Sequence, residues 1–244
     1  MPIDSQPLAL LICLLAVCLG ALVQGSVGFG LGLVAAPVLV LQIPEFVPGP
    51  LLAAALVLTI LMARRESTEI DLAGLVWLIA GRFTGSIFGA FLLLHLTPTT
   101  FKIIFGTTIL LAVGLSLAGI SIQPDRRNQS LIGILSGVMA ITTSVGGPPI
   151  ALLYQKQSGP KLRGTLSGFF LIGIIFSLFG LATVGKFGIQ ELRLTVPLTI
   201  AVLVGYGLSS VMIERLDGAK TRPIVLLLAT ASCLVILIRA WSGR

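Results

Sequence analysis

Apolar runs long enough to cross a membrane follow one another along almost the entire chain. A helix crosses the bilayer core with about 20 consecutive apolar residues, and the polar stretches between these runs are too short to form a soluble domain. Only 10% of the 244 residues are charged, whereas a soluble domain carries about 25%. A membrane β-barrel would show short alternating segments instead. The sequence therefore predicts an all-α, polytopic helical membrane protein with a single transmembrane domain over residues 1–244.

Eight apolar segments are expected, two of which are interrupted by glycine, serine and proline: 8–43 (interrupted at 24–32), 50–63, 72–94, 101–122, 130–155 (interrupted at 143–149), 164–185, 192–213 and 222–241. No Lys or Arg precedes the first segment, although Asp4 does. A secretory signal begins with positive charge, so we expect the first segment to stay in the mature protein.

The basic residues predict which loops face the cytoplasm. Most of the 16 Lys and Arg lie in short loops between apolar runs, as the positive-inside rule describes for cytoplasmic loops. We place these loops inside: 64–71, 125–127, 156–163 and 214–222. The loops near 44–48, 95–100 and 186–190 and both termini then lie outside. This distribution explains the net charge of +7 without a nucleic-acid partner.

The loop sides constrain the two interrupted segments. Segment 130–155 begins and ends at basic loops, and it is too short to cross twice, because two crossings need about 40 residues. It is therefore predicted to be a re-entrant hairpin with its tip, Ser144 to Pro149, near the middle of the membrane. Segment 8–43 begins and ends outside, as a deep hairpin or as two short crossings.

The interruptions nearly repeat each other in sequence. Residues 26–30 read Ser-Val-Gly-Phe-Gly, and residues 144–148 read Ser-Val-Gly-Gly-Pro. Corresponding loops of the two halves fall on opposite sides of the membrane, since loop 64–71 is inside and its counterpart 186–191 is outside. We therefore predict an inverted repeat of two related halves, 7–122 and 130–241, with broken or re-entrant helices. Transporters built in this way bind their substrate where the halves meet.

The broken helices suggest how an anion could be held. Glycine lets the backbone approach a ligand closely, and a half-helix that begins at Pro148 and Pro149 would direct its positive end at the hairpin tip. Hydroxyls of Ser26, Thr142, Thr143 and Ser144 would complete an oxyanion cradle. The alternative is that small residues only allow close helix packing. We favour the site at residues 144–149, because tandem prolines pack poorly in a plain helix, and we favour packing for Gly81, Gly85 and Gly89.

Arg82 is the one strong charge deep inside a continuous apolar segment. A charge at this depth is energetically costly and usually faces a cavity or a partner. No Asp or Glu lies at a comparable depth, so an unpaired cation suits an anionic substrate. The alternative is an arginine that snorkels to the membrane surface or caps backbone carbonyls.

Other reactive residues are given structural roles. Lys156, Lys161 and Arg163 follow the second hairpin and could gather anions, but we expect ordinary positive-inside loop charge. His95 is expected to be a solvated residue at the membrane surface. The three cysteines lie in apolar segments and are expected to be buried, so no metal or cofactor is predicted. The motifs of hydrolases, zinc proteases and nucleotide-binding loops are absent from the sequence, which argues against an enzyme.

These motifs resemble the TauE/SafE family, the sulfite-exporter-like membrane permeases. The resemblance covers essentially the whole chain and rests on the stretch from Gln24 to Gly30 with Pro37 after it, on Ser136-Gly137, on the stretch from Ser144 to Pro149, and on residues 163–170. It implies transport of small sulfur-containing anions across the bacterial inner membrane. It fixes neither the substrate nor the direction.

We therefore predict a secondary transporter that moves sulfite, sulfoacetate, thiosulfate or a related organosulfonate by alternating access. The alternatives are a passive anion channel and a membrane scaffold subunit that transports nothing. Coupling to H⁺ or Na⁺ and assembly into a homo-oligomer are compatible with this prediction, but no residue identifies either. The predicted substrate-binding residues are Gln24, Gly25, Ser26, Gly28, Gly30, Arg82, Thr142, Thr143, Ser144, Gly146, Gly147 and Pro148.

Overall fold

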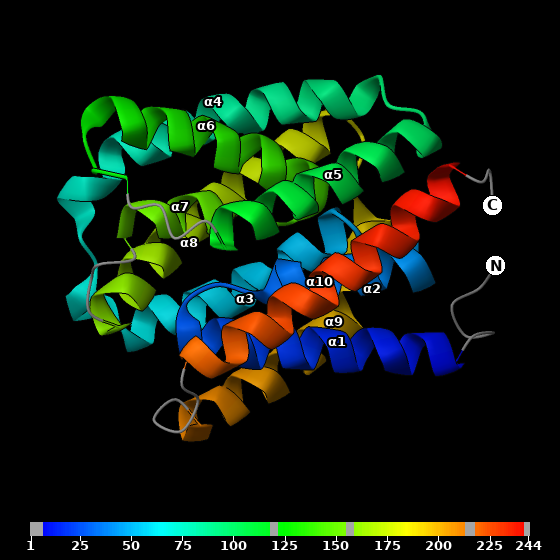
Figure 1. The fold of residues 1–244 in the computed structure, drawn as a ribbon, viewed down its shortest axis with the longest axis horizontal. Coiled ribbons are helices and arrows are strands. Elements are labelled where there is room, and N and C mark those ends of the chain that lie inside the picture. The colour runs from blue at the N-terminus through cyan, green and yellow to red at the C-terminus, as the bar shows by residue number, and fades with distance from the viewer. Residues whose placement is uncertain (1–6, 118–121, 155–158, 213–217, 242–244) are drawn as a thin grey trace.

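The fold of the chain is a bundle of helices in a computed structural model that describes residues 7–117, 122–154, 159–212 and 218–241 (Figure 1). In chain order the α-helices are α1 (Pro7–Val27), α2 (Leu31–Gln42), α3 (Gly49–Arg65), α4 (Leu72–Leu94), α5 (Pro98–Leu117), α6 (Arg126–Thr143), α7 (Gly147–Tyr154), α8 (Gly159–Thr183), α9 (Ile189–Met212) and α10 (Gly218–Trp241). Two short 3-10 helices, Pro44–Phe46 and Ser67–Glu69, flank α3. The all-α prediction is confirmed.

Five helices are long and apolar enough to cross a membrane within the part of the chain that is described: Pro7–Val27, Leu75–Leu94, Pro98–Leu115, Gly159–Thr183 and Ile189–Val211. Large apolar side chains stand exposed on their outer faces, such as Phe88 on α4 and Phe179 on α8. Such surfaces suit lipid rather than water. The chain is therefore a multi-pass membrane protein.

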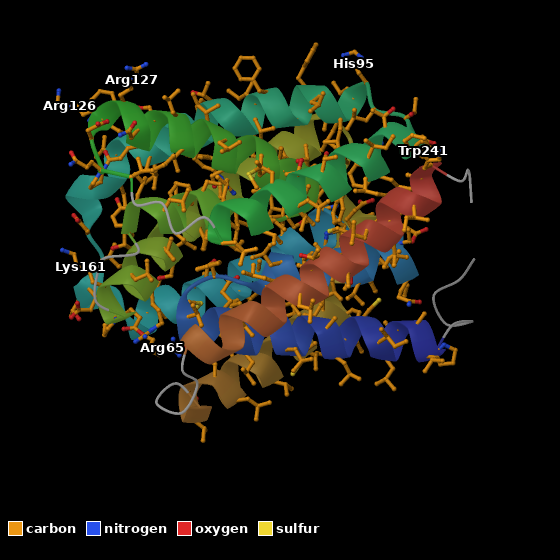
Figure 2. All side chains as sticks on the ribbon, viewed as in Figure 1. Arg65, His95, Arg126, Arg127, Lys161 and Trp241 are labelled. Atoms are coloured by element: carbon orange, nitrogen blue, oxygen red, sulfur yellow. The ribbon has the colours of Figure 1, made fainter. Side chains whose placement is uncertain are left out.

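Basic side chains from several loops gather at one end of the bundle. Figure 2 shows Arg65, Arg126, Arg127 and Lys161 at one end, and His95 and Trp241 at the other. Helix α1 begins, and α10 ends, at the end that carries His95 (Figure 1). We call the first the basic end and the second the opposite end. The arrangement agrees with the predicted cytoplasmic loops, except that Lys156 and residues 213–217 lie outside the described residues.

Both interrupted segments fold back on themselves. The chain reverses between α1 and α2, so that a Cβ added to Gly20 would lie 3.0 Å from the carbonyl oxygen of Leu31. It reverses again between α6 and α7, where the Ile122 N–H, which lies just before α6, donates to the Leu152 carbonyl near the end of α7. The two ends of this second pair are neighbours, so the predicted fold-back is confirmed, whereas its re-entry into the membrane stays a prediction. The first pair takes the form of a deep hairpin with one long and one short helix.

Glycines let helix backbones touch at two long interfaces. On the α4–α6 interface, any side chain at Gly81 or Gly85 would collide with the backbone of α6 at Ser130 or Ile134. Gly89 similarly faces Ile141 and Val138, so the packing interpretation of this glycine stripe is confirmed. Gly205 of α9 packs in the same way against the carbonyl of Cys18 in α1. Two further pairs pack together, α3 with α8 and α5 with α10.

Candidate functional site

The two helix breaks meet at a small internal cavity. Its volume is about 40 Å³, enough for about three water molecules. Its walls come from the α1–α2 break, the α6–α7 break, and the helices α3, α4 and α8. They comprise Gln24, Phe29, Gly30, Leu31, Gly32, Leu33, Leu51, Leu52, Ala55, Arg82, Ala140, Ser144, Val145, Gly146, Gly147, Pro148, Phe170 and Ile174.

The structure brings together seven of the twelve residues predicted to bind substrate. The seven that line the cavity are Gln24, Gly30, Arg82, Ser144, Gly146, Gly147 and Pro148. The five that do not line it are Gly25, Ser26, Gly28, Thr142 and Thr143. The two helix breaks therefore meet at one cavity, as expected. They line it with backbone groups more than with hydroxyl groups.

Three of the predicted hydroxyls bond to their own helices. Ser26 Oγ donates to the Leu22 carbonyl at 2.9 Å, and Thr143 Oγ1 donates to the Met139 carbonyl at 2.6 Å. Thr142 also bonds back to α6. Serine and threonine inside helices commonly bond to the carbonyl one turn earlier. The expectation that these hydroxyls face the anion is therefore corrected, and only Ser144 among the four lines the cavity.

Contact between the breaks is very close. A Cβ added to Gly147 would lie 2.8 Å from the Cβ of Phe29, and any side chain at Gly32 would collide with the carbonyl of Ser144. Glycine is thus needed on both sides. Backbone angles also require it in the first break, where φ is +107° at Gly28 and +142° at Gly30. Each break therefore positions the other.

Two helices begin at the cavity, α2 at Leu31 and α7 at Gly147. The first N–H groups of a helix have no partner within that helix. Gln24 Oε1 accepts the N–H of Leu31 at 3.1 Å, whereas the N–H groups of Gly32 and Gly147 have no protein acceptor among the described residues. Both helix starts place positive dipole ends at the same small space, which favours an anion.

Arg82 lies beneath the second break and is only 1% exposed. Its Nη1 donates to the carbonyl oxygen of Ser136 at 2.7 Å and contacts Ser136 Oγ at 2.8 Å. Its Nη2 lies 3.4 Å from Ser177 Oγ, and its Cζ stands 5.5 Å from the ring centroid of Phe169. The side chain does not snorkel; it stays inside the protein and caps one carbonyl of α6.

These partners do not satisfy the guanidinium. Arginine carries five N–H donors, and the buried Nε of Arg82 has no hydrogen-bond partner in the described part of the chain. Both ion pairs found among the described residues involve Glu66, and neither includes Arg82. A buried charge without a counter-charge is strongly unfavourable. The guanidinium therefore places a full positive charge at the wall of the cavity, and its unused Nε donor lies beside Gly173 of α8.

Ser136 and two small residues hold Arg82 in place. Ser136 Oγ donates to the Gly146 carbonyl at 2.6 Å, which ties the arginine to the hairpin tip. A Cβ at Gly173 would lie 2.7 Å from the Arg82 Nε. The substrate prediction did not include Ser136, Gly173 or Ser177. Gly173 and Ser177 are small residues one turn apart in the segment that forms α8. This spacing was the signal in the sequence that could have identified them as neighbours of Arg82.

Ser144 closes the cavity on the other side. It ends α6 in a left-handed conformation with φ of +60°, and its Oγ donates to the carbonyl of Pro48 at 3.1 Å. Pro48 immediately precedes α3. The second break is therefore linked to the start of α3 at the opposite end of the bundle.

Comparison with known proteins assigns the chain to a family. The family described as sulfite exporter TauE/SafE matches residues 12–236, which include both breaks and Arg82. No curated protein and no solved structure matches the chain. The family match covers most of the sequence and agrees with the multi-pass helices. The chain belongs to the sulfite exporter TauE/SafE family of membrane transporters.

Proposed function

We propose that the chain is a secondary transporter whose central cavity binds a small sulfur oxyanion on Arg82. Membership of the TauE/SafE family implies membrane transport of sulfur anions and not enzymatic activity. The observation that carries the proposal is the Arg82 guanidinium, which is fully buried at the cavity wall and retains an unused Nε donor. Sulfite, sulfoacetate, thiosulfate and related organosulfonates carry the complementary charge.

The helix starts add the rest of the binding site. An anion between the two breaks would face Arg82 from one side and the N–H groups of Gly32 and Gly147 from the others. Charge-assisted hydrogen bonds of this kind are about twice as strong as neutral ones. Apart from Gln24 and Ser144, the remaining walls are apolar, so the anion would lose most of its water and interact with few but strong donors.

The cavity is small, with a volume of about 40 Å³. In the proposed cycle the two breaks move apart to admit and release the anion. Paired movement of the two halves around a fixed site is how transporters of this architecture work. The predicted halves, 7–122 and 130–241, are supported by matching contacts, since α1 packs on α9 as α6 packs on α4, and α2 packs on α10 as α7 packs on α5.

We place the basic end in the cytoplasm of the bacterial cell and the protein in its inner membrane. The support is the clustering of Arg65, Arg126, Arg127 and Lys161 at that end under the positive-inside rule. The start of α1 and the end of α10 then lie on the outer side. A coupling ion, H⁺ or Na⁺, would enter from the same aqueous paths as the anion.

Uptake by proteoliposomes tests the proposal. Purified protein should transport at least one anion among sulfite, thiosulfate and sulfoacetate in a saturable manner, with acetate as the carboxylate control. Arg82→Gln should lower uptake at least tenfold, because removing one partner of a buried charged interaction costs about 2–5 kcal/mol. Arg127→Gln is the matched control, since Arg127 is exposed at the basic end. Flux that rises linearly without saturation would indicate a passive channel, and no flux of any anion would indicate a scaffold.

A further inference from the structure

A second set of charged side chains lies at the basic end, away from the central cavity. Arg65 ends α3, Glu66 follows it, and Arg163 lies in the second turn of α8. Arg163 Nε donates to Glu66 Oε1 at 2.8 Å, and Arg65 Nε lies 3.3 Å from the same oxygen. We call these three residues the basic-end cluster. One carboxylate oxygen therefore serves two guanidinium groups.

The cluster lies against the first helix break. Arg65 Nη2 donates to the carbonyl of Gly25, in the last turn of α1. A Cβ added to Gly28 would lie 3.4 Å from the Cα of Arg163. Gln24 and Gly30, on either side of these glycines, line the central cavity. In the first break, Gln24 and Gly30 therefore line the cavity, whereas Gly25 and Gly28 contact the basic-end cluster.

The charges of the cluster do not cancel. Two guanidinium groups and one carboxylate leave one net positive charge, and the side chains are largely buried, with 21% of Arg65, 15% of Arg163 and 10% of Glu66 exposed. Among the residues that the structure describes, Arg65 Nη1 is buried without a hydrogen-bond partner. The Arg65 guanidinium also stands 5.2 Å from the ring centroid of Tyr206, which fixes its plane. The cluster therefore resembles the central site in having a held cation with an unused donor.

We propose that Arg65 and Arg163 form a second oxyanion-binding station, in which the Glu66 carboxylate is the resident occupant that an incoming anion displaces. The proposal rests on the proposed transport function, because it places this station on the path between the basic end and the central cavity. When Glu66 swings away, the Nε groups of Arg65 and Arg163, which lie 3.3 and 2.8 Å from its Oε1, face the vacated position.

The chemistry of the station selects the class of ligand. The resident group is a carboxylate that engages two arginines through one oxygen. A sulfite or sulfonate group carries three oxygens on one sulfur, so different oxygens can engage the two arginines together. Arginine binds such groups through its planar, forked donors. A monovalent ion such as chloride offers a single atom and would compete poorly with Glu66.

Thiol chemistry at position 66 tests the station directly. Glu66→Cys is made in a background in which Cys13, Cys18 and Cys233 are replaced by alanine, and the detergent-purified protein reacts with anionic and cationic methanethiosulfonate reagents of similar size. We expect the anionic reagent to react on the order of tenfold faster, because a local positive field raises the encounter rate of anions. Sulfate should slow the reaction, and Arg163→Gln should remove the preference. Glu69→Cys, which is exposed in the same loop, is the control and should show neither effect.

A second variant keeps the proposal testable if Glu66→Cys does not fold. Glu66→Gln removes the resident charge but keeps the shape, so it should unfold at a lower temperature in chloride and regain stability in sulfate at equal ionic strength. Wild type and Glu69→Gln should respond much less to sulfate. Equal rates for the two reagents, no protection by sulfate, or no sulfate-specific recovery of Glu66→Gln would overturn the station. None of these measurements depends on transport. Normal uptake by Arg82→Gln would contradict the central site and would leave the result for the second station unchanged.

Discussion

Gly146 lies directly against the guanidinium of Arg82, so that a Cβ at position 146 would stand 2.5 Å from Nη1. Ser136 joins the two, since its Oγ donates to the Gly146 carbonyl and contacts the same Nη1. The tip of the second hairpin therefore packs directly against the buried Arg82 guanidinium. Movement of the hairpin and the electrostatics of the cavity are coupled through this contact.

Replacing this glycine tests the contact. Gly146→Ala should push the guanidinium away from Ser136 and lower anion uptake at least fivefold, mainly through a higher KM, because the donors no longer point at the cavity. Uptake kinetics in proteoliposomes measure this change. Gly114→Ala is the control, since no described residue lies within 4 Å of a Cβ at that position. Wild-type kinetics for Gly146→Ala would show that the site does not use this geometry.

Removing the serine should affect both stability and binding. Ser136→Ala deletes the hydroxyl between Arg82 and Gly146 and leaves buried groups without partners, which costs about 1–3 kcal/mol. We expect a lower unfolding temperature and weaker anion protection against unfolding, measured by thermal denaturation with and without sulfite. Ser130→Ala is the comparison, because Ser130 Oγ only donates to the Arg126 carbonyl of its own helix. Equal stability of the two variants would argue against the Arg82–Gly146 link.

The contact between the two breaks gives a further prediction. Gly147→Ala would force its new Cβ against the Cβ of Phe29, 2.8 Å away, and so separate the two helix starts. Transport should fall severely while the helical content, measured by circular dichroism, stays the same. Gly207→Ala, which has open space around it, should behave as wild type. Normal transport by Gly147→Ala would mean that the breaks can separate without loss of the site.

Glycines of the α4–α6 interface should behave differently from those of the cavity. Gly85→Ala places a methyl group against the backbone carbonyl of Ile134, which no change of side-chain rotamer can relieve. We expect lower yield and a lower unfolding temperature, but an unchanged KM in the fraction that folds. The measurement is size-exclusion chromatography followed by uptake kinetics. A changed KM with normal stability would mean that this interface belongs to the transport site.

Much of the helical layout follows from hydrophobic pattern alone. The segment predicted at 72–94 is α4 with the same bounds, and both interruptions coincide with helix breaks. Apolar length and the positions of glycine and proline are local properties, so they can be read along the chain. The buried Arg82 was also readable, because a single charge within an apolar segment needs no knowledge of its neighbours.

The partners of that charge could not be predicted. Ser136 and Ser177 meet Arg82 only after α4, α6 and α8 have packed. The sequence predicted that the hydroxyls of Ser26 and Thr143 bind the substrate. In the structure each hydroxyl donates instead to the carbonyl one turn earlier in its own helix. Glu66 was similarly predicted to be part of an ordinary loop, and it became buried only because α8 begins beside the end of α3.

The most direct test of the central claim is to locate an oxyanion by anomalous X-ray scattering in crystals grown with selenite, which has the charge and shape of sulfite. We predict a selenium peak in the cavity between the two breaks, with an oxygen about 2.7–2.9 Å from a guanidinium nitrogen of Arg82, and no such peak for Arg82→Gln. A cavity without selenium in wild-type crystals that carry an ordered Arg82, under conditions in which selenite is transported, would contradict the account.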